Sequence, residues 1–92
     1  MAKPPDKKTD LTIPTRAADQ LGVAVARFRL QARLSQVALA KSAGLRQATV
    51  SKVERGAPNA EIKTIYAICA ALGLELVVRP RETKVFRPEE FF

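Results

Sequence analysis

The six prolines of this 92-residue chain limit where helices can form. Proline lacks a backbone N–H and clashes with the preceding turn, so a helix tolerates it only near its start. Three prolines lie before residue 15, one lies at position 58 and two lie after residue 79. Helices can therefore run uninterrupted within residues 15–57 and 59–79, and we expect the folded domain at residues 15–79.

Two segments of different character flank this domain. Residues 1–14 mix Lys, Pro, Asp and Thr with little apolar content, and we interpret them as a flexible arm. Residues 80–92 begin with a helix-breaking proline and are interpreted as a tail. No stretch approaches the roughly 20 apolar residues of a membrane helix, and no apolar block follows the basic N-terminus. We expect no membrane association and a cytoplasmic, nucleoid-associated protein.

Apolar residues at three- and four-residue steps predict a series of helices. Thr15 and Ser35 can cap the first two by accepting a hydrogen bond from a backbone N–H group. Gly44 suits the left-handed turn that ends the second helix, and Gly56 and Gly73 close the third and the fourth. The expected helices cover residues 15–32, 36–42 and 46–54, and run from residue 59 or 61 to residue 72.

The periodicity changes after Gly73. Leu74, Leu76 and Val78 occupy alternate positions and Pro80 ends the run, which predicts one short strand. A single strand leaves its edge groups unpaired, and the fourth helix has an unusually wide apolar face. We therefore expect a homodimer in which this strand pairs with the same strand of a second copy. The expected dimer residues are Ile65, Ile68, Cys69, Leu72, Leu74, Leu76 and Val78.

The composition argues against catalysis and metal binding. The chain has no His and one Cys, so it lacks the commonest general base, an internal disulfide and a Cys-based metal site. Cys69 and Tyr66 are expected in the core or the dimer interface. The four glycines stand alone and form no phosphate-binding loop. We expect no enzyme activity and no cofactor.

Residues 35–56, SQVALAKSAGLRQATVSKVERG, have helix-turn-helix spacing. Ala40 lies four residues before Gly44, and Val50 lies six residues after it. The motif needs a small residue where two helices cross, a glycine free to take positive φ, and a β-branched core residue in the second helix. The sequence here resembles the Xre/Cro-like helix-turn-helix family, and the resemblance covers residues 15–79.

Within that family the chain most resembles HipB-type antitoxins, on the stretches LRQATVSKVERG and ALGLELVVRP. The resemblance implies a mainly α, lambda-repressor-like domain of four to five helices, with one C-terminal strand paired across a homodimer. It also implies a repressor of its own operon that binds an inverted-repeat operator and neutralises a HipA-like kinase. Two alternatives remain open: a free-standing Xre-family regulator without a toxin, and a protein-interaction module that has lost base readout.

The charge distribution independently favours DNA. The chain carries a net charge of +7, from 16 Lys and Arg against 9 Asp and Glu. Residues 19–56 hold seven cationic and two acidic side chains, a net +5, whereas residues 57–92 hold five of each and balance at zero. Most of the net charge therefore lies on the segment that would meet phosphate groups.

The resemblance implies that the third helix lies in the major groove with its N-terminal residues toward the bases. Gln47 can bond to adenine in a bidentate manner, Arg46 can face guanine, and Ala48 can touch a thymine methyl group. The expected base-reading residues are Arg46, Gln47, Ala48 and Ser51. The expected phosphate-binding residues are Gln36, Thr49, Lys52 and Ser35.

Arg29 has two candidate roles, a phosphate contact or an internal ion pair with Glu54. The resemblance implies the ion pair, and we expect it. Arg33 departs from the family pattern because glycine or asparagine commonly stands before Leu34. Arg33 therefore either takes positive φ or belongs to a different turn.

The tail VFRPEEFF is also unusual for a simple repressor, because it places three large apolar groups near two prolines. Phe86, Phe91 and Phe92 form a candidate toxin-binding element. The alternatives are that these residues pack against the dimer strands or are disordered.

Overall fold

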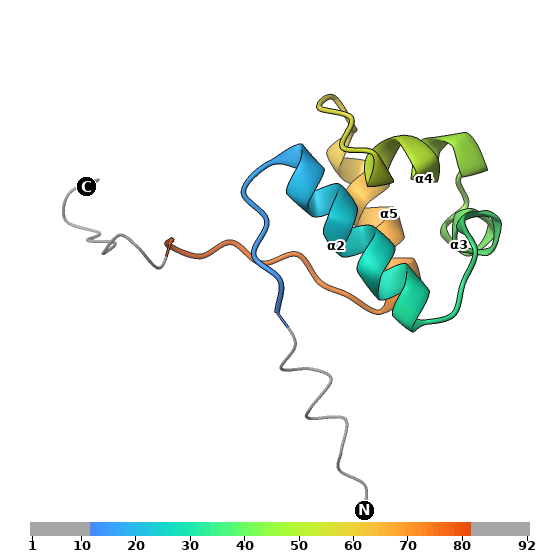
Figure 1. Cartoon of the computed structure of the whole chain (residues 1–92), viewed down its shortest axis with the longest axis horizontal. Coiled ribbons are helices and arrows are strands. Elements are labelled where there is room, and N and C mark those ends of the chain that lie inside the picture. The colour runs from blue at the N-terminus through green and yellow to red at the C-terminus, as the bar shows by residue number, and fades with distance from the viewer. Residues whose placement is uncertain (1–11, 82–92) are drawn as a thin grey trace, which may run out of the picture.

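The apolar residues of the periodic stretches meet in one core within residues 12–81, the part of the chain that the computed structural model describes. Figure 1 shows α4 lying across one end of α2, with α3 beside them and α5 behind α2. The expected mainly helical fold is confirmed, with boundaries close to those predicted. The four helices of the described part are α2 (Ala18–Gln31), α3 (Gln36–Ala43), α4 (Gln47–Glu54) and α5 (Ile62–Leu72).

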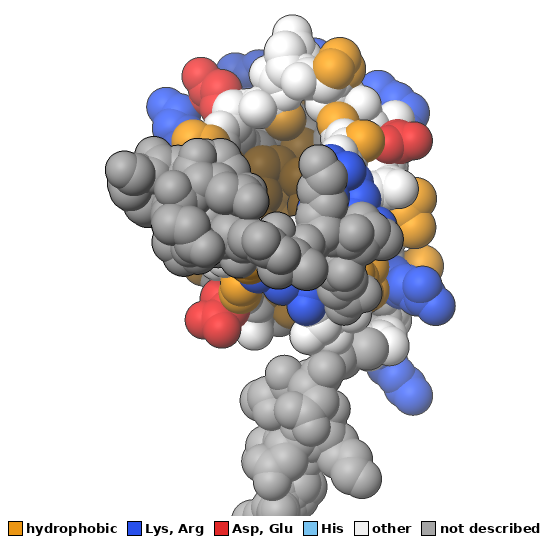
Figure 2. All heavy atoms as spheres, turned by 90° about the vertical axis from the view of Figure 1, so that its left-hand side faces the viewer, with side chains coloured by type: hydrophobic (Ala, Val, Ile, Leu, Met, Phe, Trp, Pro, Cys, Tyr) orange, Lys and Arg blue, Asp and Glu red, His pale blue; other side chains and the backbone are white. Residues whose placement is uncertain are grey.

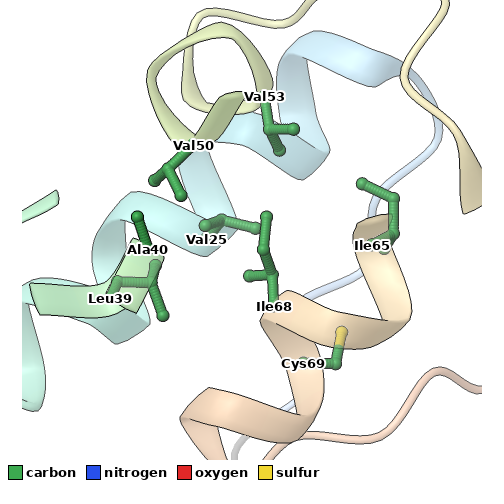
Figure 3. Close-up of a cluster of buried hydrophobic side chains, with 8 residues drawn as sticks. All are labelled: Val25, Leu39, Ala40, Val50, Val53, Ile65, Ile68 and Cys69. Carbon is green, nitrogen blue, oxygen red and sulfur yellow. The ribbon is translucent and has the colours of Figure 1, made fainter. Parts of the chain in front are cut away.

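Side chains from all four helices form this core. Leu39, Val50 and Ile68 are completely buried, and Val25 is nearly so. Burial of side chains of this size stabilises a fold by about 1.5–3 kcal/mol each, so the core orients α3 and α4 relative to each other. Figure 3 shows the core residues pointing toward a common centre: Val25, Leu39, Ala40, Val50, Val53, Ile65, Ile68 and Cys69.

The capping prediction is confirmed for α3 and wrong for α2. Ser35 is the N-cap of α3, and its Oγ accepts a hydrogen bond of 3.0 Å from the backbone N–H of Ala38. Helix α2 begins later than expected, with Ala17 as its N-cap and no side-chain capping bond. Thr15 therefore lies before the cap position, too early in the chain to accept from the first free N–H groups of the helix.

Among the described residues, positive φ occurs at Gly44, as predicted, and at three further residues. Gly44 ends α3 in the left-handed region with φ 73°, a conformation that costs glycine little because it has no Cβ. Gly56 and Gly73 also take positive φ. Arg33 has φ 61° and is the only residue other than glycine with positive φ in the described part. Of the two alternatives for the turn between α2 and α3, the structure shows the left-handed arginine.

Gly22 has a role that the periodicity did not predict. It is buried in α2, where α4 crosses closely. A Cβ at this position would lie 2.5 Å from the carbonyl oxygen of Val53 and 2.6 Å from that of Glu54. Only glycine allows the two helices to approach this closely, and the contact places the end of α4 against α2.

Residues 74–81 form neither a helix nor a strand in the single chain. Leu74 packs against the core, whereas Leu76 and Val77 are exposed and Val78 is 97% exposed. In Figure 1 this segment leads away from the end of α5. A strand that pairs with a second copy has no partner within one chain, so both the strand and the pairing stay predictions.

Three of the expected dimer residues lie in the core of one chain. Ile65, Ile68 and Cys69 are buried in the core of one chain, so their side chains are not available to a second copy. Helix α5 is apolar on two sides, and periodicity does not show which side faces the core of one chain. The dimer interface itself stays a prediction. Leu72 and Leu74 are half-buried against the same core.

Replacing Gly22 with Ala tests the close crossing of α2 and α4. We expect a loss of about 1–3 kcal/mol in the free energy of unfolding, because the new methyl group forces the α4 backbone away. Urea denaturation followed by circular dichroism measures this change. The control is Val23→Ala, at an exposed position of the same helix. Equal stabilities for the two variants would contradict the crossing.

Candidate nucleic-acid interface

Helices α3 and α4 are joined by a turn that is held at two points. The backbone N–H of Leu45 donates to the carbonyl oxygen of Ala40 at 2.8 Å, which closes the end of α3 around Gly44. The Leu45 side chain packs against the core. The direction in which α4 leaves the turn is therefore set by backbone hydrogen bonding and by apolar packing together.

The expected base-reading residues lie along the first half of α4. Arg46 is the N-cap of the helix, and Gln47 and Ala48 follow in its first turn; all three are exposed. Ser51 lies one turn further along and is half-buried. Its hydroxyl accepts a hydrogen bond from the Arg55 guanidinium group. The structure thus presents three of the four at the exposed end of the helix.

The expected phosphate-binding residues are less uniform. Lys52 is exposed, and Ser35 is exposed while capping α3. Thr49 and Gln36 are half-buried. Gln36 is already engaged in hydrogen bonds to other side chains, a feature that the sequence did not reveal.

A nearly buried ion pair links α2 to the end of α4. Arg29 Nε lies 2.6 Å from Glu54 Oε2, and Arg29 Nη2 donates to Oε1 at 3.0 Å. The side chains are only 12% and 7% exposed. Arg29 Nη1 also donates to the backbone carbonyl of Leu34 at 2.9 Å, which ties in the loop before α3. The expected ion pair is confirmed, and all three nitrogens of the Arg29 guanidinium group donate hydrogen bonds within the chain.

Both members of the pair are strongly held in their charged forms. Burial acts to raise the pKa of the Glu54 carboxyl, but hydrogen bonds from Arg29 and Gln36 and the charge of Arg29 outweigh it, so this pKa is lowered. The hydrogen bond to Glu54 raises the pKa of Arg29 above its ordinary value, against the effect of burial. The pair therefore remains ionised throughout the neutral range.

Two glutamines extend this ion pair to the surface. Gln36 Nε2 donates to Glu54 Oε1 at 2.9 Å, and Gln47 Nε2 donates to Gln36 Oε1 at 2.8 Å. Sequence reasoning assigned these glutamines to a phosphate and a base separately and missed that they bond to each other. The available signal was positional, because each glutamine opens one of the two helices of the motif.

A match to a family model shows the family to which the chain belongs. The family model described as "Helix-turn-helix" matches residues 25–78, which include both helices of the motif and all of α5. The chain belongs to the helix-turn-helix family. Comparison with curated proteins gives no significant match.

Solved structures similar to this helix-turn-helix domain include complexes of HipB. One described as "HipB-O4 20mer complex" has a TM-score of 0.70 and 29% sequence identity, covering 75% of this chain and 97% of that chain. "Structure of HipA-HipB-O2-O3 complex" gives the same four values. "HipB-O1-O2 complex" has a TM-score of 0.68 and 30% identity over 73% of this chain and 97% of that chain. The HipB-type resemblance is therefore confirmed.

Positive charge surrounds the motif of the helix-turn-helix domain. Within the described residues 19–56, Arg29 is the only cationic side chain in an ion pair. Lys41 on α3 and Arg46 and Lys52 on α4 are exposed. The exposed cations on the two helices of the motif suit a polyanion such as DNA. Figure 2 shows the opposite side of the domain, the left-hand side of Figure 1, where Lys and Arg side chains also stand around the outline.

Other classes of site find less support. No group of three or more His, Cys, Asp or Glu that could hold a metal ion occurs among residues 12–81. Of the helices in the same range, none is long and apolar enough to cross a membrane. Burial raises the pKa of the Cys69 thiol, which disfavours the reactive thiolate. Phe86, Phe91 and Phe92 lie outside the described residues.

The lowered pKa of Glu54 predicts a pH-dependent stability. Because the pKa is lower in the folded chain than in the unfolded one, the stabilisation is complete above the unfolded value of about 4.3 and is lost as the pH falls toward the folded value. We expect Glu54→Gln to reduce the free energy of unfolding by about 1–3 kcal/mol at pH 7, and this difference to shrink below about pH 4.

Urea denaturation across a pH series measures this dependence. The control is Glu61→Gln, because Glu61 is 69% exposed and lies 3.9 Å from an exposed Lys63. A pair of this kind contributes little in water, so the control follows the wild type closely. If the difference between Glu54→Gln and the wild type stays constant with pH, the contribution of the ionised carboxylate is refuted.

Proposed function

We propose that this protein is a sequence-specific transcriptional repressor that binds an inverted-repeat operator as a homodimer. The observation that carries the proposal is the exposed amide of Gln47 in the first turn of α4, held by a hydrogen bond from its nitrogen to Gln36. The N-terminal end of a recognition helix is where repressors of this architecture contact base edges. A glutamine held at that end suits direct readout of a base pair.

The neighbours of Gln47 suit the same role. Arg46 offers a guanidinium fork for guanine, and Ala48 offers a methyl group for contact with thymine. Ser51 accepts from Arg55 through its oxygen, and its own hydroxyl hydrogen stays available for a base one turn deeper in the groove. The four residues together would read neighbouring base pairs in one half-site.

The contacts to the DNA backbone would come from both helices of the motif. The first turn of α3 has free backbone N–H groups, which favour a phosphate near Ser35 and Gln36. Thr49 and Lys52 would reach the backbone from α4. These contacts hold the protein in register on the duplex but do not distinguish one sequence from another.

The proposed dimer uses apolar side chains that the core leaves exposed. Ile62 and Tyr66 lie four residues apart on α5 and so share a face of the helix. Leu76, Val77 and Val78 add exposed apolar surface after α5. A second copy placed on this surface would cover it and would bring two recognition helices to half-sites about 34 Å apart, one turn of DNA.

The second proposed role is that of an antitoxin that binds a HipA-like kinase. The support is the similarity to HipB, which forms complexes with HipA in a structure related to this chain at 29% identity. The candidate kinase-binding residues are Phe86, Phe91 and Phe92. The two roles are separable, because base contacts come from α4 and the aromatic residues stand in the tail.

Replacing Gln47 with Ala tests base readout. The probes are a duplex from the DNA upstream of the gene and a scrambled duplex, with binding measured by fluorescence anisotropy across a salt series. We expect the wild type to prefer the upstream duplex by about a thousandfold or more. The variant loses roughly 5- to 150-fold in affinity for that duplex and little for the scrambled one.

The control for this variant is Gln31→Ala, which removes an exposed amide from α2. It retains wild-type binding to both duplexes. Equal, steeply salt-dependent binding of the wild type to both duplexes would refute sequence-specific repression and would favour the interaction-module alternative.

Replacing Tyr66 with Glu tests the dimer surface. Tyr66 is 55% exposed in one chain, so the fold tolerates the change, whereas a buried interface does not accept an unpaired carboxylate. We expect the molar mass from light scattering to fall from that of two chains to that of one. Val23→Glu places the same charge at a 61% exposed position on α2 and leaves the dimer intact. Dimers of both variants would place the interface elsewhere.

Deleting residues 86–92 tests the role of the tail. Operator affinity stays close to that of the full chain, and binding to a HipA-like kinase encoded beside the gene is lost in a pull-down. If operator affinity collapses instead, the tail belongs to the dimer fold. If kinase binding persists, the aromatic residues are not the contact.

A further inference from the structure

We infer that the guanidinium group of Arg33 binds a DNA phosphate beside the first turn of α3. This inference rests on the proposed function and adds one residue to its DNA interface. It starts from the way in which the helices of the described part end. One of them ends on an arginine at a position where the other three have glycine.

The four helices within residues 12–81 end in the same pattern of backbone hydrogen bonds. After α3, the N–H of Gly44 donates to the carbonyl oxygen of Lys41 at 3.3 Å, and the N–H of Leu45 donates to that of Ala40 at 2.8 Å. This pair of bonds is the Schellman motif, which places one residue in the left-handed region and usually has glycine there. The residues at this position are Arg33 after α2, Gly44 after α3, Gly56 after α4 and Gly73 after α5.

The turn after α2 forms the motif as completely as the other three. The N–H of Arg33 donates to the carbonyl oxygen of Leu30 at 2.9 Å, and the N–H of Leu34 donates to that of Arg29 at 3.1 Å. The Arg29 side chain then holds the carbonyl oxygen of Leu34 at 2.9 Å. Because the backbone is bonded on both sides of Arg33, the turn imposes the φ of 61° on this residue.

An arginine in this conformation destabilises the turn relative to glycine. Its Cβ crowds the backbone when φ is positive, whereas glycine adopts the same angles without this cost. The side chain does not offset the cost, because Arg33 is exposed and its guanidinium group makes no hydrogen bond or ion pair in the part of the chain that the structure describes. Within the folded domain glycine would suit this position better, which indicates that the arginine acts on something outside the chain.

The position of Arg33 favours DNA as that outside partner. Arg33 lies two residues before Ser35, the N-cap of α3, where the proposed contacts with the DNA backbone begin. In Figure 1 the loop that contains it leads directly from α2 into α3. Arg29 uses its guanidinium group within the chain, so Arg33 is the cation without an internal partner that stands nearest to Ser35 in the sequence. A guanidinium fork matches two oxygens of one phosphate group.

A phosphate contact has two consequences that can be measured. It strengthens binding to any duplex by the same factor, because it touches no base. It also makes binding more sensitive to salt, since each neutralised phosphate adds about 0.9 to the slope of the logarithm of affinity against the logarithm of salt concentration. A dimer carries two copies of Arg33, so loss of both contacts would reduce the slope by about 1.8.

Arg33→Gly and Arg33→Ala separate the side chain from the backbone. Both remove the charge, but only glycine relieves the left-handed conformation. We expect Arg33→Gly to melt about 4–8 °C above the wild type and Arg33→Ala to melt close to the wild type, as followed by circular dichroism. Fluorescence anisotropy across a salt series then shows both variants losing roughly tenfold or more in affinity for the upstream and the scrambled duplex alike.

Two control variants separate a local contact from general charge. Arg33→Lys keeps the charge and the Cβ, so it retains most of the affinity and of the salt slope. Arg27→Ala removes an exposed cation from the middle of α2 and keeps the salt slope of the wild type. A reduction of the slope in Arg27→Ala equal to that in Arg33→Ala would mean that net charge alone is responsible, which would overturn the inference.

The remaining outcomes assign the arginine elsewhere or support the contact. If Arg33→Gly gains stability and keeps the affinity and salt slope of the wild type, the turn merely tolerates the arginine and the inference is wrong. A loss for the upstream duplex alone would make Arg33 a base contact instead. Unchanged DNA binding with loss of a HipA-like kinase in a pull-down would assign it to a protein partner.

Failure of the proposed function is distinguishable from failure of this inference. A wild type that binds both duplexes alike refutes sequence-specific repression. In that case an equal loss of affinity and of salt slope in Arg33→Gly and Arg33→Ala still supports the phosphate contact, because the contact does not depend on the base sequence.

Discussion

The ion pair between Arg29 and Glu54 is the interaction on which the arrangement of the motif depends. It joins α2 to the last residue of α4, and through the carbonyl oxygen of Leu34 it also holds the loop that leads into α3. Removing one partner would leave a charge that is largely excluded from water, a change that costs more than the pair itself contributes. The contacts of the pair therefore fit one relative placement of α2, α4 and the loop before α3.

Apolar packing sets the positions of the helices, and hydrogen bonds set the directions of polar side chains at their surface. The close crossing at Gly22 and the side chains around Leu39 and Val50 bring α2, α3 and α4 together. Apolar contacts are not directional, and they leave the polar side chains at the surface free to rotate. The hydrogen bonds that run from Glu54 through Gln36 to Gln47 add directional contacts between the ends of α3 and α4.

Much of the fold could be predicted because its signals are local. The spacing of Ala40, Gly44 and Val50 and the capping by Ser35 agree with the structure. The Arg29–Glu54 pair joins residues 25 apart; it was expected from the family resemblance and is also confirmed. The sequence did not show which side of α5 faces the core, because both of its sides are apolar. Its core side includes Ile65, Ile68 and Cys69, and its exposed side includes Ile62 and Tyr66. Only the positions of the other helices distinguish the two.

The sequence by itself determined that the chain forms a series of helices, where most of them end, and that two of them form a helix-turn-helix, because proline, glycine and apolar periodicity act over a few residues. Tertiary structure alone decided which partners Gln36 and Gln47 have. Gln36 bonds to partners 18 and 11 residues away, Glu54 and Gln47, and these contacts exist only once three helices are packed. A directional bond between distant residues depends on the placement of whole helices, which no local pattern encodes.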